Sequence, residues 1–436
     1  MKKRPLLLFI SWTISIASVA QSNLLTPEQA VQLAIQNNFN VSLERNAQEI
    51  GRINNNWGTA GALPTLNATG SSSIASNNLE QKLANGTVIT RDGAILRNVN
   101  AGMQMSWRIF DGFRMFATKK RLEELETIGE TNFRRQINAT VFDVISAYYN
   151  IVQLQQQQKA VQETIRFFEE RQSIAESRFK IGTAPKTDFL QAQVDLNTQK
   201  ALLMQVENAL GIAKSNLNHL LGREPGVAYE VSDVIAPDAS VNYDRFRQKA
   251  RDDNFDLMLA RSNLAVLLQE KREIIAQRLP TITVNGNYNF AQSRNDAGFN
   301  LFNRNAGPNG NIGIAIPLFN GGNNIRQQKI ADINIVNQQV TMKQVENQVQ
   351  TNLLNAYLRY QNALNMAALE KTTLQLIQEN NSIATERFKK LAITSLELRQ
   401  VQIDFINSQT RYINTLFMAK IAETEMKLLA GELGTL

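Results

Sequence analysis

The stretch 98-NVNAGMQMSWRIFDG-112 decides the fold, because its side chains alternate in character as far as Phe110. The odd-numbered positions are apolar, and the even-numbered positions are polar or glycine until the pattern ends. Successive side chains of a β-strand point to opposite faces of a sheet. The alternation therefore predicts a strand over 98–110 with one apolar and one polar face.

Similar alternation predicts strands over 281–292 and 309–319, and a weaker pattern predicts a strand over 65–75. These strands pair as two hairpins, with polar loops expected at 76–97 and 292–308. Their lengths suit the ~9–11 residues that cross a bilayer, and Trp107, Tyr288 and Phe290 suit the aromatic girdles at a membrane surface. A soluble sandwich, in which the apolar faces meet in a dry core, is the alternative.

Four strands cannot close a membrane barrel by themselves, since the smallest such barrels have about eight strands. Two chains would supply eight strands, whose interior is roughly filled by side chains. Three chains would supply twelve strands and leave an open lumen. If the protein is a conduit, the strand count favours a homotrimer.

Long coiled-coil helices fill most of the remaining chain. Within 185–222 the positions from Phe189 to Leu220 that form the packing stripe recur at intervals of three and four residues. The stretch 394–431 repeats this spacing, which predicts helices that pack with a left-handed supercoil. The proline-free stretch 113–180 predicts one helix of about 100 Å at ~1.5 Å per residue.

An internal duplication organises the sequence, because residues 30–70 align without gaps onto 246–286 and residues 107–222 match 316–431. We expect a first repeat over 21–222, a linker over 223–245 and a second repeat over 246–436. A short helix opens the first repeat. The long helices expected in the two repeats cover 39–62, 113–180 and 185–222 in the first, and 255–279, 320–390 and 394–431 in the second.

The N-terminal residues 1–20 read as a secretory signal peptide, because three basic residues precede an apolar stretch and a small-residue cleavage site before Gln21. The chain of 436 residues has no cysteine and one histidine, His219. Thiol chemistry, cysteine zinc sites, multi-histidine metal sites and lipidation of a mature cysteine are therefore excluded. No catalytic constellation, cofactor motif or metal motif is present, which argues against an enzyme. The formal net charge is +7, and without the three basic residues of the signal peptide it falls to +4 (43 basic against 39 acidic residues), which is too mild to suggest nucleic-acid binding.

Several motifs in combination resemble the TolC family of outer-membrane efflux proteins, over nearly the whole mature chain. The opening helix contains Leu25-Thr26-Pro27-Glu28-Gln29-Ala30. Leu63-Pro64-Thr65-Leu66 and Leu279-Pro280-Thr281-Ile282 enter the strands, and Phe110-Asp111-Gly112 and Phe319-Asn320-Gly321-Gly322 leave them. A further motif, Arg178-Phe179-Lys180-Ile181-Gly182-Thr183, precedes Asp188.

The resemblance implies a mainly α-helical fold with a β-barrel portion. Three chains would form a twelve-stranded barrel in the outer membrane of a Gram-negative bacterium, continued by an α-barrel of helices through the periplasm. Such a channel accepts substrates from a periplasmic adaptor protein and an inner-membrane pump, contacts outer-membrane lipid, and is not an enzyme. The rival interpretation is a soluble periplasmic coiled-coil scaffold. Drugs, metal ions and secreted polypeptides all remain open as cargo.

The resemblance also places a gate at the two helix turns, which would form the periplasmic tip. Acidic residues line the constriction in the family, and the corresponding positions are Glu397 and Gln400, with Asp188 and Asp404 nearby. The second turn departs from the family pattern at Phe388, Leu391 and Ile393, so we predict an apolar closure through these three side chains. The residues expected to meet an adaptor are Lys180, Ile181, Gly182, Thr183, Lys186, Lys389 and Lys390.

Overall fold

The computed structural model describes residues 24–238 and 240–435, so the predicted signal peptide lies outside the described residues. Two compact units divide the chain. We call the unit of Met1–Asn38, Asp143–Ala239 and Tyr360–Ile421 the turn unit, because it holds both helix turns. We call the unit of Phe39–Phe142, Ser240–Arg359 and Ala422–Leu436 the sheet unit.

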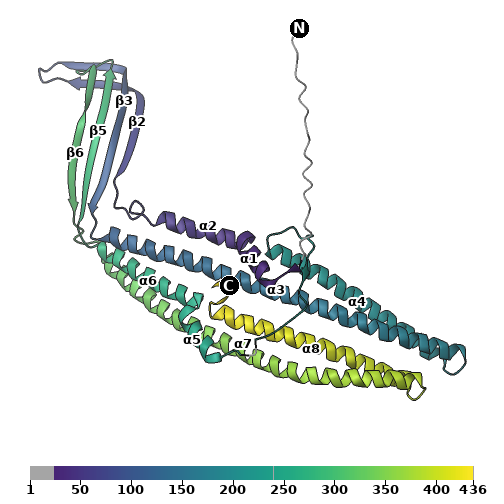
Figure 1. Ribbon diagram of the computed structural model, residues 1–436. Helices are drawn as coiled ribbons and strands as arrows, with labels where there is room; N and C mark the ends of the chain where they lie inside the picture. The colour runs from purple at the N-terminus through teal and green to yellow at the C-terminus, as the bar shows by residue number, and fades with distance from the viewer. Residues whose placement is uncertain (1–23, 239, 436) are drawn as a thin grey trace, which may run out of the picture. The chain divides into compact units, whose positions relative to one another are not determined.

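The sheet unit contains one four-stranded antiparallel sheet (Figure 1). Its strands are β2 (Thr65–Lys82), β3 (Val88–Phe110), β5 (Thr281–Asn295) and β6 (Phe302–Ala315), in the order β2-β3-β5-β6. The two hairpins predicted from the sequence are thus joined edge to edge through β3 and β5. The strands β2 and β6 form the two edges.

The strands extend further into the predicted loops than the sequence indicated, although β6 ends at Ala315 rather than at the predicted 319. The loop expected at 76–97 is mostly strand, because β2 and β3 stay paired out to Lys82 and Val88. The loop expected at 292–308 shrinks in the same way, since Arg294 still pairs with Phe302. Polar residues occupy both faces of much of these stretches, so the alternation fades while the backbone ladder continues.

The register places side chains of like character on the same face of the sheet. Trp107 lies opposite Val284 and Met103 lies opposite Tyr288, which makes the odd-numbered face of β3 the apolar face. The opposite face is rich in asparagine and glutamine, and Asn287 Nδ2 donates to Asn309 Oδ1 at 3.0 Å. The sheet is therefore two-faced, as the alternation predicted.

Eight α-helices accompany the strands in the described part of the chain, and β1 (Leu24–Leu25) pairs in parallel with β4 (Glu230–Val231). The helices are α1 (Pro27–Asn37), α2 (Phe39–Asn54), α3 (Arg114–Lys180), α4 (Lys186–Leu220), α5 (Tyr243–Asp253), α6 (Phe255–Ala276), α7 (Asn323–Lys389) and α8 (Ser395–Leu429). A short 3₁₀ turn, η1 (Leu433–Thr435), follows. None of the described helices is long and apolar enough to cross a membrane.

The predicted packing stripes are confirmed by burial. In α4 the buried positions include Ala192, Leu196, Leu210 and Leu217. In α8 the buried positions of the stripe are Leu398, Phe405, Ser408, Thr415, Ala419, Ala422 and Met426. Within the turn unit, α4 runs back along the end of α3, and α8 runs back along the end of α7 (Figure 1). The 3.5-residue spacing thus selects the side chains that face the partner helix.

Each repeat fastens the end of its last helix in the same way. Asn38 Nδ2 donates to Leu220 O in the turn unit, and Asn254 Nδ2 donates to Leu429 O in the sheet unit, both at 2.9 Å. Gly222 follows the first of these helix ends with a φ of 65°, and a Cβ there would lie 2.5 Å from Asn37 O. Only glycine tolerates both this conformation and this approach.

Candidate gate at the helix turns

Both helix turns have the same backbone design. In the first, Thr183 N donates to Arg178 O at 2.9 Å, and Gly182 takes a φ of 77°. In the second, Ala392 N donates to Arg387 O at 2.9 Å, and Leu391 takes a φ of 62°. This is the left-handed helix cap that normally uses glycine. A leucine there costs roughly 1–2 kcal/mol of backbone strain, so the departure seen in the sequence has a structural consequence.

Phe388 is the centre of the packing beside the second turn. It is buried with Ala384 and Leu398, and Ile393 packs against this cluster. Arg178 crosses from the first hairpin, where its Nη2 donates to Phe388 O at 2.6 Å and its guanidinium carbon lies 4.2 Å from the ring centroid. Burial lowers the pKa of Arg178. One arginine thus fastens the two hairpins of the turn unit together through both the backbone and the ring.

Leu391 and Ile393 differ in their surroundings, although both were predicted to join the closure. Ile393 is half-buried against the Phe388 cluster, whereas Leu391 is 64 % exposed. Ile181 at the first turn is 73 % exposed. The turn unit therefore presents apolar side chains at both turns that no other described residue covers.

Glu397 stands at the start of α8 and forms a capping box with Thr394. Its carboxylate accepts from Thr394 N at 2.7 Å and from Thr394 Oγ1 at 2.9 Å, while Glu397 N donates back to Thr394 Oγ1 at 3.2 Å. These bonds, the backbone bond first, lower the pKa of Glu397. The side chain remains exposed, so it is an ionised helix cap that is also open to solvent.

The other predicted constriction residues lie along the same two hairpins. Gln400 Nε2 donates to Asp404 Oδ1 at 2.9 Å, and both side chains are exposed. Asp188 is half-buried in the first turn of α4. Its negative charge acts to raise the pKa of Arg178, against the larger lowering by burial. Exposed carboxylates in this region thus come mainly from the second repeat.

The residues predicted to meet an adaptor are all exposed around the two turns. Lys180 pairs with Glu176 at 2.7 Å, and Lys389 bridges Glu170 at 2.8 Å and Glu386 at 3.0 Å. These two carboxylates, Glu170 first, raise the pKa of Lys389 to about 12. Each residue of the predicted contact set is therefore accessible to solvent, namely Lys180, Ile181, Gly182, Thr183, Lys186, Lys389 and Lys390.

A buried ionic network joins the two hairpins and was not predicted. Arg171 is fully buried and donates through Nη2 to Asp195 Oδ2, while Gln191 Nε2 donates to Asp195 Oδ1 at 2.8 Å. Arg399 Nε forms an ion pair with Asp195 Oδ2 at 3.0 Å, and Arg171 Nη1 donates to Gln402 Oε1 at 3.3 Å. Burial lowers the pKa of Arg171, although Asp195 acts in the opposite direction. Nothing in the local pattern marks this network, because its members come from α3, α4 and α8.

The predicted girdle residues lie in the sheet unit on the apolar face. Trp107 Nε1 donates to Ala62 O at 2.9 Å near the helix end of β3, and its ring is partly exposed. Tyr288 is exposed, and Phe290 lies further along β5 beneath the guanidinium of Arg304. The three rings therefore mark two levels along the sheet.

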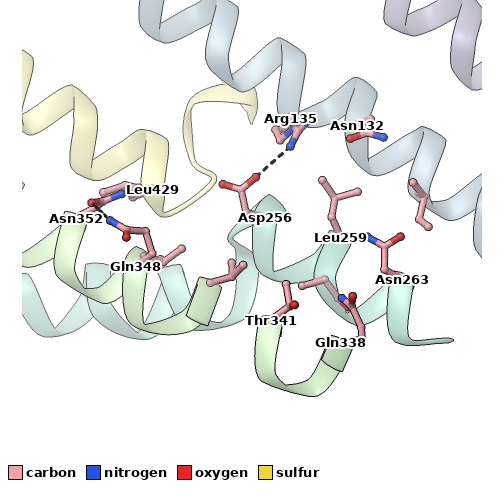
Figure 2. A pocket seen from close by; sticks show the side chains of 14 residues that line it. Asn132, Arg135, Asp256, Leu259, Asn263, Gln338, Thr341, Gln348, Asn352 and Leu429 are labelled. Atoms are coloured by element: carbon pink, nitrogen blue, oxygen red, sulfur yellow. Dashed lines mark hydrogen bonds and ion pairs between the residues drawn. The ribbon is translucent and has the colours of Figure 1, made fainter. Parts of the chain in front are cut away.

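A pocket of about 530 Å³ lies within the sheet unit, between α3, α6 and α7 (Figure 2). Polar side chains dominate its labelled lining, and Arg135 Nη1 meets Asp256 Oδ1 across it at 3.2 Å. Gln338 Nε2 donates to Ala260 O at 2.9 Å and ties α7 to α6. The described residues contain no cluster of acidic or histidine side chains that would hold a metal ion. The exposed Arg135–Asp256 pair contributes little stability.

The outer membrane efflux protein family matches residues 30–223 and 246–432, so the chain belongs to this family. The two matched ranges coincide with the duplication found in the sequence. The chain is similar to Protein CyaE of Bordetella pertussis, with 23 % identity over 80 % of this chain and 73 % of the relative. It is also similar to the alkaline protease secretion protein AprF of Pseudomonas aeruginosa, with 22 % identity over 69 % of this chain and 64 % of the relative.

Solved structures support the same fold. The chain superposes on the crystal structure of CusC, a transmembrane channel, with a TM-score of 0.75 and 18 % identity over 95 % of both chains. This similarity confirms the predicted fold class, which is that of the channel-tunnel proteins. Family membership also confirms that the protein is an outer-membrane channel protein rather than an enzyme or a soluble scaffold. Members of the family form trimers that work with adaptor proteins and inner-membrane pumps.

Proposed function

We propose that three copies of this chain form a passive conduit across the outer membrane, fed by a periplasmic adaptor and an inner-membrane pump. The observation that carries this proposal is the two-faced sheet with its two uncapped edges. β2 and β6 present long rows of backbone groups, which are a template for pairing with another chain. Pairing β6 of one copy with β2 of the next closes a barrel of twelve strands, with the apolar face toward lipid and the amide-rich face toward the lumen.

The cargo follows from the relatives only as a class. AprF is named for the secretion of a protease, and the family is named for efflux. The polar face is lined mainly by asparagine and other uncharged side chains, with Arg108 as a charged exception, which suits a duct for diverse cargo selected elsewhere. We therefore propose a role in efflux or type I secretion, in which the adaptor and pump choose the substrate.

The turns of the turn unit form the gate of this conduit. Leu391 and Ile181 are exposed apolar side chains at the turns, and Phe388 and Ile393 support the second turn from within. Contacts between copies at the narrow end would cover these exposed side chains and close the path. The exposed carboxylates of the second repeat, in three copies, would attract cations at the constriction.

Conductance of purified protein in planar lipid bilayers tests the conduit and its gate together. Native mass spectrometry should give a trimer, and the wild-type channel should rest at low conductance. Phe388→Ala and Ile393→Ala should raise the resting conductance, because each removes support from the second turn. Phe179→Ala is the matched control, since Phe179 is the equivalent residue of the first repeat but stacks at the surface on Phe189. Unchanged resting conductance in both gate variants would refute the apolar closure.

A further inference from the structure

Three arginines lie on the apolar face of the sheet, above the aromatic side chains. Arg97 lies directly opposite Arg294, and Arg304 lies opposite Gln292 in the same sheet. The pairing between β3 and β5 is continuous from Leu96 to Arg108, so Arg97 shares the face of Trp107. The three guanidinium groups therefore belong to the face that the conduit turns toward lipid.

Two of the three arginines lie over aromatic rings, and none of the three is paired with a carboxylate of the described residues. The guanidinium carbon of Arg304 lies 5.3 Å from the ring centroid of Phe290, and that of Arg294 lies 5.7 Å from the ring centroid of Phe302. All three arginines are exposed, and none forms an ion pair with another described residue. The carboxylate of Asp296 is turned to the backbone, where it accepts from Ile95 N at 2.5 Å.

The positive charges of these arginines repel one another, which is unfavourable for the sheet. Like charges directly opposite each other on one face of an antiparallel pair destabilise it. Arg97 and Arg294 are such a pair, and the rings beneath Arg294 and Arg304 fix the position of the charges without neutralising them. An anion placed between the guanidinium groups would remove the repulsion, and the planar donors of arginine suit phosphate oxygens.

The height of the cluster matches a lipid headgroup. Arg97 lies ten residues along β3 from Trp107, which is about 33 Å at ~3.3 Å per residue. Strands of membrane barrels tilt by ≈ 35–45°, so this distance corresponds to roughly 25 Å across the membrane, the height of the apolar band. With Trp107 at the boundary next to the helices, the arginines reach the opposite boundary, which faces outside.

We propose that Arg97, Arg294 and Arg304 form a binding site for the phosphate groups of a phosphorylated glycolipid in the outer leaflet. This inference rests on the proposed conduit, because it takes the apolar face to meet lipid. The aromatic rings contact the upper acyl chains, while the guanidinium groups bind the headgroup phosphates. One such site on each copy would give the trimer a ring of bound lipid.

Native mass spectrometry of the trimer tests this proposal with two probes, bis-phosphorylated lipid A and the same lipid after removal of its phosphates. The wild-type protein should bind the phosphorylated form more tightly. Arg97→Gln, Arg294→Gln and Arg304→Gln together should weaken that binding by roughly 100-fold, at about fivefold per arginine near a lipid surface. The binding of the dephosphorylated lipid should not change.

Arg108→Gln is the matched control, because Arg108 lies on the polar face of the same strand. This variant should bind both lipids as the wild type does. Equal binding of the two lipids by the wild-type protein overturns the phosphate site, even if the triple variant does not fold. Conductance of the wild-type protein in zwitterionic bilayers separates the two ideas: a conducting channel with no phosphate preference overturns only the lipid site, whereas a protein that forms no channel overturns the conduit and the site together.

Discussion

The buried network around Asp195 gives the sharpest test of how the turn unit is held together. The carboxylate of Asp195 accepts hydrogen bonds from Arg171 and Gln191 and forms an ion pair with Arg399. The side chain of Arg171 is 1 % exposed and that of Asp195 is 8 % exposed, whereas Arg399 is 37 % exposed. Replacing Asp195 with asparagine keeps the shape of the side chain and removes its charge. The guanidinium of Arg171 then stays buried without a counter-charge.

The size of the effect follows from this burial. Removing one partner of a buried ion pair costs about 3–5 kcal/mol, because the remaining charge is uncompensated. Arg399→Gln should cost only about 1 kcal/mol, since solvent already screens a side chain that is partly exposed. The order of the two variants is therefore fixed by burial rather than by the distances, which are those of close contacts in both cases.

Hydrogen exchange followed by mass spectrometry measures this locally. A loss of about 3 kcal/mol in the opening free energy should speed exchange of the protected amides around Arg171 and Asp195 by roughly 100-fold. Asp404→Asn is the matched control, because Asp404 is the equivalent residue of the second repeat and pairs only with Gln400 at the surface. If Asp195→Asn and Asp404→Asn exchange at the same rate in these segments, the buried charge is not what joins the hairpins.

Three other substitutions test the backbone and the cap. Leu391→Gly should raise the free energy of unfolding by about 0.5 kcal/mol, because relief of the left-handed strain exceeds the entropy that glycine adds to the unfolded chain; a lower melting temperature would contradict this. Gly222→Ala should cost about 2 kcal/mol or more in urea unfolding, since its Cβ meets a carbonyl oxygen at 2.5 Å, whereas Gly226→Ala has open space and should be neutral. The lowered pKa of Glu397 means that its bonds to Thr394 stabilise α8 above the usual pKa of 4.5 and are lost as the pH falls through the lowered value. Circular dichroism of Glu397→Gln should lack this acid-induced loss of helix stability, and an unchanged acid transition would refute the role of the cap.

Period and repetition predicted most of the fold because they are local signals repeated along the chain. The stripe from Phe189 to Leu220 selected the buried side chains of α4, and the alternation around Trp107 selected the faces of the sheet. The duplication also placed equivalent helices in both repeats: α1 and α5 match in length, and α5 begins at Tyr243 inside the stretch expected to be a linker. Some helix ends differed from the prediction, as at Asn54, where α2 stops before the predicted end at 62 and Asn56 Nδ2 donates to Ile53 O at 2.8 Å.

Features that depend on residues far apart in the sequence were harder to predict from it. Arg171 lies on α3, and its partners on α4 and α8 lie 24 and 231 residues away. A single sequence contains no signal that pairs them. The extension of β2 and β3 into the polar stretch at 76–97 was hidden for a related reason, since pairing through the backbone does not require alternating side chains.

The two repeats contain an equivalent glutamine–aspartate pair that has a different role in each. Gln191 donates to Asp195 in the first repeat, and Gln400 donates to Asp404 in the second, at almost equal distances of 2.8 and 2.9 Å. In the first repeat two arginines surround the carboxylate of Asp195, so its negative charge is paired where the two hairpins meet. In the second repeat the carboxylate stays exposed. The duplication thus gives two equivalent glutamine–aspartate pairs. Arg171 and Arg399 pair with the aspartate of the first, which joins the hairpins, whereas the aspartate of the second keeps an exposed negative charge. In a trimer, this asymmetry favours the second repeat as the source of charge at the constriction, and Asp404→Asn should reduce cation selectivity of the open channel whereas Asp195→Asn should not.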